Sequence, residues 1–214
     1  MGYFITFEGI EGSGKTTQIR KAAGFLAAER IPCLLTEEPG GTGLGRILRK
    51  ILLDKTALRI GDRAELLLFA ADRAQHVEEI ILPALREGKV VLCDRFSDAT
   101  AAYQGFGRGL DRDAVRWLSE FAAGSLRPDR TYLFDISPDE GLERVRMRSA
   151  ENGTNPPEKD RFEGEEVVFH RRIREGYLAL AGEEPDRFRV FRGSDPVDSL
   201  HREVVRDLLA LLRR

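Results

Sequence analysis

The chain has 214 residues, of which 42% are hydrophobic, and this is enough for one well-buried core with a mobile insertion. Thirty-four basic and thirty-six acidic side chains leave a formal net charge of −2, which argues against a general attraction to nucleic acid and favours a small-molecule partner. The only two cysteines, Cys33 and Cys93, lie in apolar, strand-like surroundings without metal-ligand spacing, so we expect buried free thiols. No apolar stretch is long enough for a membrane span and no signal-peptide pattern is present, which predicts a cytoplasmic protein with no membrane contact.

The first predicted strand, at residues 3–8, leads into a glycine-rich loop. Residues 9–16 read Gly-Ile-Glu-Gly-Ser-Gly-Lys-Thr, and a segment with helical periodicity follows. Glycines let backbone N–H groups converge on phosphate oxygens, Lys15 can reach β- and γ-phosphates, and the Thr16 hydroxyl can ligate Mg²⁺. A turn that binds nothing is disfavoured, because strand, loop and helix N-terminus occur in the order that phosphate binding needs. The predicted phosphate-binding loop comprises Gly9, Ile10, Glu11, Gly12, Ser13, Gly14, Lys15, Thr16 and Thr17.

Short apolar runs alternate with longer helical patterns along the rest of the chain. Strands are predicted near 3–8, 31–36, 89–94, 131–136 and 187–192. This alternation predicts an α/β fold, with a five-stranded parallel sheet covered by helices on both faces. The runs at 90–93 and 132–134 are almost wholly apolar, as in central strands. The periodic segment from 197 to the end predicts a last helix, which closes the sheet or packs on a partner.

The segment 63–87 carries an apolar helical stripe, and Arg73 falls on that stripe one turn after Phe69. Pro83 predicts a kink or break in this helix. Arg73 either forms a salt bridge, with Asp72 or an acidic residue of a neighbouring helix, or stands beside an aromatic platform that suits a planar base. The sequence leaves both interpretations open.

Asp94 and Arg95 follow the third predicted strand. Ligands of open α/β sheets bind beyond the carboxyl ends of the strands. Asp94 would therefore lie beside the phosphate loop, where it can hold Mg²⁺ directly or through water. The guanidinium group of Arg95 can donate two parallel hydrogen bonds to one phosphate. The alternative is a structural salt bridge at the end of the strand.

Residues 149–160 are a long polar run rich in turn residues, and they predict a mobile loop. Arg144 and Arg148 precede it with i, i+4 spacing, while Asp160 and Arg161 follow it. Like charges at this spacing repel on an isolated helix, and an anionic ligand would offset the repulsion. Arginines on a closing lid can neutralise a transferring phosphoryl group. The alternative is a solvated basic helix face with acidic neighbours.

Together these segments resemble the bacterial thymidylate kinases, nucleoside monophosphate kinases that phosphorylate dTMP. The resemblance spans nearly the whole chain. It rests on Phe-Glu-Gly-x-x-Gly-x-Gly-Lys-Thr-Thr at 7–17, Glu-Pro-Gly-Gly-Thr at 38–42, Phe69 with Arg73, Asp-Arg-Phe at 94–96, Ala-Tyr-Gln-Gly at 102–105 and Asp-Arg-Phe-Glu at 160–163. It implies a P-loop kinase fold in a single domain (1–214) with a short lid at about 144–161, a homodimer, ATP with Mg²⁺ as the donor and dTMP as the acceptor.

The resemblance also implies roles on the acceptor side. Phe69 would stack on thymine and Arg73 would bond a base carbonyl. Thr100 and Gln104 would line the base and sugar pocket. Tyr103 would lie against the sugar where a 2′-hydroxyl would point, which favours deoxyribose.

For the phosphates, the resemblance places Arg95 on dTMP and Glu11 near the sugar 3′-hydroxyl and the metal site. Gly12 leaves the loop without an arginine, so Arg144 and Arg148 of the lid become the candidates for ATP contact and charge stabilisation. The implied catalytic residues are Lys15, Arg95, Arg144 and Arg148, and the implied metal ligands are Thr16 and Asp94.

Four positions depart from the family pattern. Glu37 stands where arginine is usual and Arg46 where glutamate is common, which a swapped surface ion pair would explain. Phe96 replaces a usual tyrosine and Ala99 a usual serine, so hydrogen bonds carried by those hydroxyls elsewhere are not expected here.

Three other functions are alternatives to this interpretation. A kinase for another nucleoside or nucleoside monophosphate would share the loop and the Asp-Arg strand end. A nucleotide-dependent switch would bind nucleotide without a second substrate, but the chain has no Asn-Lys-x-Asp segment that would read guanine. A nucleic-acid-binding protein conflicts with the near-neutral charge.

Overall fold

A five-stranded parallel sheet forms the centre of this computed structural model, which describes residues 2–54, 59–151, 161–162 and 165–213. The strands are β1 (Phe4–Glu8), β2 (Cys33–Glu37), β3 (Val90–Asp94), β4 (Arg130–Asp135) and β5 (Phe188–Arg192), in the order β2-β3-β1-β4-β5. The five predicted strands and their parallel arrangement are thus confirmed. After β1 the chain crosses to β2 at one edge of the sheet, and after β3 it crosses in the opposite direction to β4, on the other side of β1. Such a switch opens a crevice at the carboxyl ends of β1 and β3.

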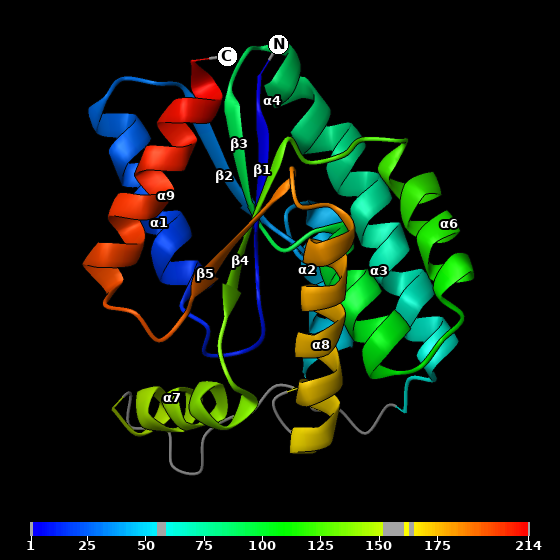
Figure 1. The fold of residues 1–214 in the computed structure, drawn as a ribbon. Helices are drawn as coiled ribbons and strands as arrows, with labels where there is room; N and C mark the ends of the chain where they lie inside the picture. The colour runs from blue at the N-terminus through cyan, green and yellow to red at the C-terminus, as the bar shows by residue number, and fades with distance from the viewer. Residues whose placement is uncertain (1, 55–58, 152–160, 163–164, 214) are drawn as a thin grey trace.

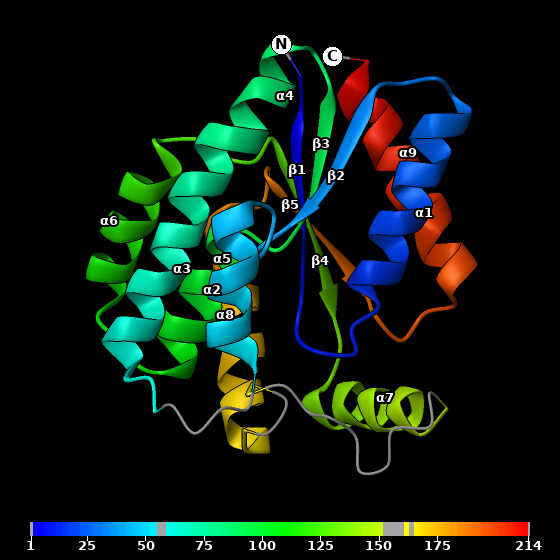
Figure 2. The same cartoon turned by 180° about the vertical axis from the view of Figure 1, so that it is seen from behind.

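Helices cover both faces of the sheet, as predicted (Figures 1 and 2). One face carries α1 (Lys15–Ala28) and α9 (Val197–Leu212); the other side carries α2 (Gly43–Leu53), α3 (Asp62–His76), η1 (Val77–Ile81), α4 (Leu82–Arg86), α5 (Ser97–Thr100), η2 (Ala101–Gly107), α6 (Arg112–Ala123) and α8 (Val167–Glu183). A further helix, α7 (Pro138–Glu151), lies beyond the carboxyl ends of the strands, and both chain termini lie at the opposite end (Figure 1). None of the described helices is long and apolar enough to cross a membrane.

The core forms where the helices pack on the central strands. Ile5 of β1 and Leu92 of β3 are fully buried in one cluster with α1 and α9, and Val204 and Leu208 of α9 belong to it. The last helix therefore closes the sheet internally. The apolar runs at 90–93 and 132–134 are buried, as expected for central strands.

The long helical segment that was expected to change at Pro83 continues through it. α3 passes directly into the π-helical turn η1 and then into α4, where Pro83 occupies the first turn. The Leu82 N–H bonds the Val77 carbonyl oxygen five residues earlier, so Pro83, which has no N–H to donate, directly follows this wider π-helical turn and does not break the helix. Of the predicted lid, residues 144–151 form the end of α7; the rest of the predicted mobile run, including Asp160, lies outside the described residues.

Candidate active site

The phosphate loop joins β1 to α1. Gly14 precedes α1 with a φ of 88° and provides no side-chain cap, so the first N–H groups of the helix are available to an anion. Gly12 has a φ of 72°, and a Cβ there would come within 2.1 Å of the Gly141 carbonyl oxygen of α7. A side chain therefore cannot be accommodated at residue 12 unless α7 moves. An arginine at this position would require a different placement of α7.

Lys15, Thr16 and Asp94 meet at the crevice between β1 and β3. The Thr16 hydroxyl donates to Asp94 Oδ2 at 2.7 Å, and Lys15 Nζ donates to the Ile10 carbonyl oxygen at 3.5 Å. Burial and the neighbouring Arg95 lower the pKa of Lys15, although the nearby carboxylates act in the opposite direction. Among the described residues no group of three or more His, Cys, Asp and Glu side chains could hold a metal ion alone. One hydroxyl and one carboxylate do fit Mg²⁺, which takes most of its oxygen ligands from phosphates and water.

Arg95 is held between the phosphate loop and α8. Its backbone φ is 72°, in the left-handed region, and its Nη2 donates to Glu11 Oε1 at 3.0 Å. Its Nη1 donates to the Tyr177 hydroxyl at 3.3 Å, and its guanidinium carbon lies 4.9 Å from the centre of the Tyr103 ring. Tyr103 also donates a short hydrogen bond to Glu11 Oε1. The guanidinium is thus oriented on several sides beside the loop.

Besides Arg95 and Tyr103, Glu11 has a third polar neighbour, His170 of α8. The buried His170 places Nδ1 3.3 Å from Glu11 Oε2. Burial alone would raise the pKa of Glu11, but His170 and the charges of Arg95 and Lys15 outweigh it and hold that pKa well below its usual range. Glu11 is therefore a carboxylate at neutral pH.

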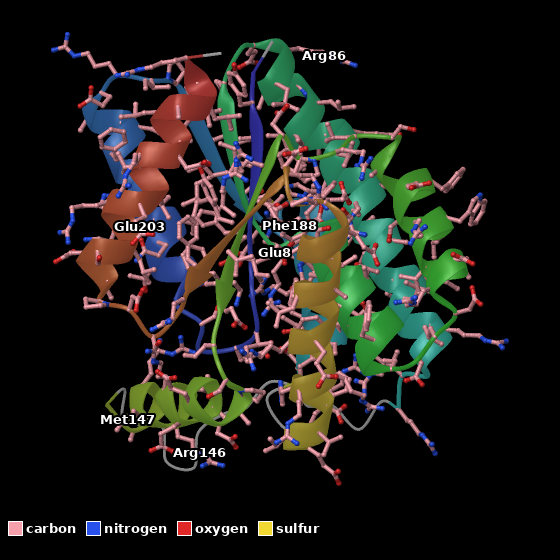
Figure 3. The ribbon with its side chains drawn as sticks, viewed as in Figure 1. Glu8, Arg86, Arg146, Met147, Phe188 and Glu203 are labelled. Atoms are coloured by element: carbon pink, nitrogen blue, oxygen red, sulfur yellow. The ribbon has the colours of Figure 1, made fainter. Side chains whose placement is uncertain are left out.

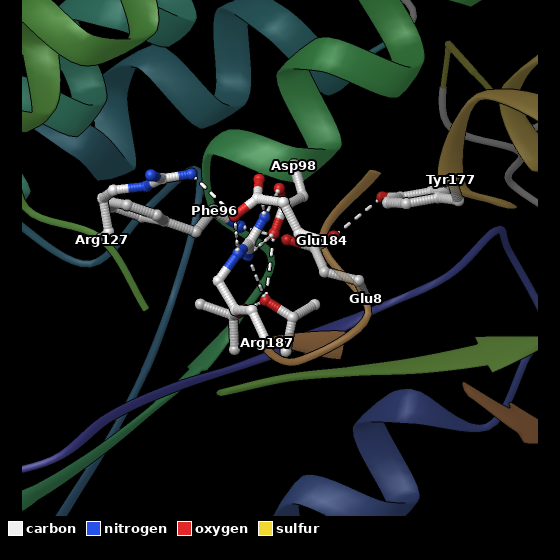
Figure 4. Close-up of polar contacts among 9 residues, drawn as sticks. Glu8, Phe96, Asp98, Arg127, Tyr177, Glu184 and Arg187 are labelled. Carbon is white, nitrogen blue, oxygen red and sulfur yellow. Dashed lines mark hydrogen bonds and ion pairs between the residues drawn. The ribbon is translucent and has the colours of Figure 1, made fainter. Parts of the chain in front are cut away.

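Glu8, the last residue of β1, accepts hydrogen bonds from two residues that adjoin Arg95. The Phe96 backbone N–H donates to Glu8 Oε1 at 2.7 Å, and the Tyr177 hydroxyl donates to Oε2 at 2.8 Å. The first bond holds the peptide that follows Arg95, and the second orients the Glu8 carboxyl group. Glu8 lies at the centre of the molecule, close to Asp98, whose carboxylate receives both Nη groups of Arg187 (Figures 3 and 4). Burial and the charge of Asp98 raise the pKa of Glu8 to about 8.

Arg73 lines the same crevice and forms a buried ion pair. It is only 2% exposed; its Nε donates to Glu38 Oε2 at 3.0 Å and its Nη2 donates to Thr100 Oγ1 at 2.9 Å. Its partner comes from the turn after β2 rather than from Asp72 or a neighbouring helix. His76 Nδ1 lies 2.9 Å from Glu38 Oε1, and the Arg73 guanidinium lies 5.0 Å from the centre of the Phe96 ring.

An aromatic wall stands next to Arg73. The Phe69 ring lies 6.2 Å from the Phe162 ring, which in turn meets the Tyr103 ring edge-on at 5.4 Å. Gln104, on the same π-helical turn as Tyr103, donates from Nε2 to Glu65 Oε1 at 2.9 Å. The wall and the amide thus come from three separate stretches of the chain.

The two lid arginines differ in their surroundings. Arg144 Nη1 donates to the Gly193 carbonyl oxygen at 2.9 Å and lies 3.5 Å from that of Gly12, while its Nη2 pairs with Glu140. Arg148, one turn later, is exposed and faces the crevice. The residues between them point elsewhere, since Arg146 and Met147 lie on the outer side of α7 (Figure 3). Arg161, at the other end of the predicted lid, donates to the Leu52 carbonyl oxygen and to Glu65 instead of entering the crevice.

These residues surround one cavity of about 620 Å³, a volume typical of small-molecule sites. The predicted site residues that line it are Glu11, Gly12, Gly14, Lys15, Thr16, Thr17, Phe69, Arg73, Asp94, Arg95, Thr100, Tyr103, Gln104, Arg144 and Arg148. Gly9, Ile10 and Ser13 are buried within the loop and do not line it. The structure thus brings the donor-side and acceptor-side candidates into one space.

Sequence reasoning missed several residues at this site. Glu38 lies in a motif that could have identified it as an acid for Arg73, but His170 and Glu65 carry no local signal, and only the fold brings them to Glu11 and Gln104. The hypothesis of a swapped ion pair between Glu37 and Arg46 is wrong, because Glu37 pairs with Arg49 at 3.1 Å, about one turn further along α2.

Comparison with known proteins identifies the family. The family model described as "Thymidylate kinase" matches residues 7–204. The chain is 53% identical over 208 residues to the thymidylate kinase of Syntrophus aciditrophicus, covering 97% of this chain and 94% of that protein. It is also 53% identical over 199 residues to that of Geobacter sulfurreducens, covering 93% and 92%. The crystal structure of thymidylate kinase from Ehrlichia chaffeensis superposes with a TM-score of 0.77 at 34% identity and covers 98% of this chain and 100% of that one. The fold described above, together with these matches over nearly its whole length, means that this chain is an enzyme of the thymidylate kinase family.

Proposed function

We propose that this enzyme transfers the γ-phosphoryl group of ATP to the 5′-phosphate of dTMP and gives dTDP and ADP. One observation carries the proposal: a single cavity has the phosphate loop with Lys15 at one end, Arg95 beside it, and the Phe69 wall with Arg73 further along. A kinase for two nucleotides needs these three parts in one space, because catalysis requires donor and acceptor to be aligned. A nucleotide-dependent switch needs only the phosphate loop with its lysine.

On the donor side, the loop amides, the N-terminus of α1 and Lys15 would bind the β- and γ-phosphates. Thr16 and Asp94 would hold Mg²⁺, since their oxygens are already adjacent. When bound, Mg²⁺ neutralises charge on the phosphate oxygens of the nucleotide. Arg144 contacts the loop next to Gly12 and, with Arg148, would contact ATP and add positive charge near the transferring group.

On the acceptor side, the attacking atom is an anionic phosphate oxygen, so no general base is needed. Arg95 would bind this phosphate with the fork of its guanidinium, which Glu11 and Tyr177 already orient. A phosphate would then share Arg95 with Glu11, and Glu11 keeps His170 as a second neighbour. Catalysis would therefore consist of alignment and charge neutralisation.

The base would lie against Phe69, with Arg73 at its edge. Arg73 Nη1 is buried and has no hydrogen-bond partner within the described part of the chain, so a donor is available for a base carbonyl. Thr100 is bonded to the same guanidinium, and Gln104 also borders the cavity. Tyr103, beside Glu11, would lie against the sugar and disfavour a 2′-hydroxyl.

We further propose a single domain over 1–214 with a lid at about 144–161, and a homodimer in solution. The support for the dimer is an apolar surface on α6: Trp117 and Phe121 are 65% and 74% exposed and their rings stack at 5.7 Å. Leu67 of α3, a helix that contacts α6, is exposed as well. Exposed aromatic side chains of this kind mark protein interfaces. The cytoplasmic location stays a prediction from the sequence.

The test is whether ADP release depends on the acceptor. Purified enzyme with Mg-ATP should release ADP rapidly only when dTMP is added, with dTDP as the second product. Lys15→Ala should lower the turnover by orders of magnitude with an unchanged circular dichroism spectrum, because it removes charge at the phosphates without opening the core. Release that does not depend on dTMP would favour the switch, and near-normal turnover of Lys15→Ala would refute the assignment.

A further inference from the structure

Gln104 borders the proposed base pocket with an amide group whose orientation the neighbouring residues determine. Its side chain is only 1% exposed, and Nε2 donates to Glu65 Oε1 at 2.9 Å. An amide has a donor end and an acceptor end of nearly the same shape, so its partner decides which end faces which way. The partner here is Glu65.

Glu65 is fully buried on α3 and can act only as a hydrogen-bond acceptor. Arg108 donates to both of its oxygens, from Nε and Nη2 at 3.3 Å each, and Arg161 donates a further bond. The guanidinium groups can only donate, so both oxygens of Glu65 accept hydrogen bonds from them, and a carboxylate has no proton to give to Gln104. If the Gln104 amide turned over, its oxygen would face the Glu65 oxygen without a proton between them.

The orientation of Gln104 leaves its carbonyl oxygen, Oε1, for a ligand in the cavity that this residue lines. Arg73, which lines the same cavity, offers the unpartnered donor Nη1. The pocket therefore presents one acceptor and one donor to the edge of a base. Thymine and uracil match this pair with their N3–H and their 4-carbonyl oxygen, whereas cytosine presents an N3 acceptor and a 4-amino donor.

From this geometry we infer that Glu65 is a positioning residue for substrate choice: by holding the Gln104 amide in one orientation, it makes the pocket select 4-oxo pyrimidine nucleotides over 4-amino ones. The inference rests on the proposed function and names the group that enforces its specificity. Glu65 acts only through Gln104. Removing its charge therefore releases the amide and lets it present its NH₂ group to a cytosine.

The experiment measures kcat/KM for dTMP, dCMP and dUMP on each enzyme preparation. The variants are Glu65→Gln, whose amide can pair with Gln104 in either orientation, Gln104→Ala, and the two together. Ratios between substrates on one sample do not depend on the fraction of folded enzyme. Glu65→Asp provides a second variant, because it keeps a charge for Arg108 and Arg161 but withdraws the carboxylate from Gln104. Arg108→Lys is the control that disturbs the same cluster and keeps Glu65.

Glu65→Gln and Glu65→Asp should each lower the dTMP to dCMP ratio by roughly tenfold or more, because a mismatched buried hydrogen bond discriminates at least that strongly. The dTMP to dUMP ratio should not change, since those bases share the same edge, and Arg108→Lys should alter neither ratio. In the Gln104→Ala background, Glu65→Gln should have no effect on the dTMP to dCMP ratio. An unchanged dTMP to dCMP ratio in both Glu65 variants, or an equal fall in the Gln104→Ala background, would overturn the inference. Failure of the unaltered enzyme to phosphorylate dTMP would instead refute the proposed function.

Discussion

Replacing Arg73 by alanine should destabilise the folded chain as well as weaken acceptor binding. The guanidinium is 2% exposed, and its main partner, Glu38, is almost equally buried. Removing one member of a buried ion pair costs about 3–5 kcal/mol, because the other charge remains in a poorly solvated place. His76 still faces Glu38 at 2.9 Å and offsets part of this loss. We therefore expect about 3 kcal/mol, the lower end of that range.

Urea unfolding followed by far-UV circular dichroism measures this cost. The matched control is Lys21→Ala, which also removes a cation from an ion pair, but Lys21 and its partner Asp198 are 37% and 79% exposed. That variant should lose less than about 1 kcal/mol. If Arg73→Ala also lost less than about 1 kcal/mol, the buried pair with Glu38 would not exist as described. At low urea, where both variants are folded, only Arg73→Ala should weaken dTMP binding in a calorimetric titration.

Three further predictions concern the loop, the proposed interface and pH. Gly12→Ala should lower both the melting temperature and the affinity for ATP, because its Cβ would meet Gly141 and its φ is positive; Gly24→Ala, in open space on α1, should do neither. Trp117→Glu should shift a dimer to a monomer in analytical ultracentrifugation, and an unaltered protein that is monomeric at all concentrations would contradict the interface. Burial and Asp98 raise the pKa of Glu8 from 4.5 to about 8, so its contribution to stability is complete below pH 4.5 and is lost as the pH rises toward 8. Glu8→Gln should therefore lose less in melting temperature than the unaltered protein between about pH 5 and pH 8, and equal losses would contradict this sign.

Sequence reasoning worked best where a function depends on neighbours in the chain. The phosphate loop and β1 are one continuous segment, and the apolar run that ends at Asp94 shows both a central strand and its carboxyl end. These features follow from local composition and from the general rule for ligands of parallel sheets.

Contacts between distant segments could not be predicted in the same way. The partner of Arg73 lies 35 residues away in a turn, and the partner of Gln104 lies 39 residues away on α3. Several acidic residues were equally suitable in sequence, and only the packing of α3 against its neighbours selects Glu38 and Glu65. The same reason explains why the predicted pairing of Glu37 with Arg46 was wrong. Arg46 and Arg49 both lie on α2, and the rotation of that helix about its axis decides which of them faces Glu37.

The most direct test of the central claim is a comparison of acceptors. Purified enzyme and Mg-ATP are incubated separately with dTMP, dUMP, dCMP and AMP, ADP release is followed in a coupled assay, and the nucleotide products are separated by chromatography. The account predicts the highest kcat/KM for dTMP, with one dTDP formed for each ADP. A higher kcat/KM for AMP or dCMP, or ADP release without any dTDP, would contradict it.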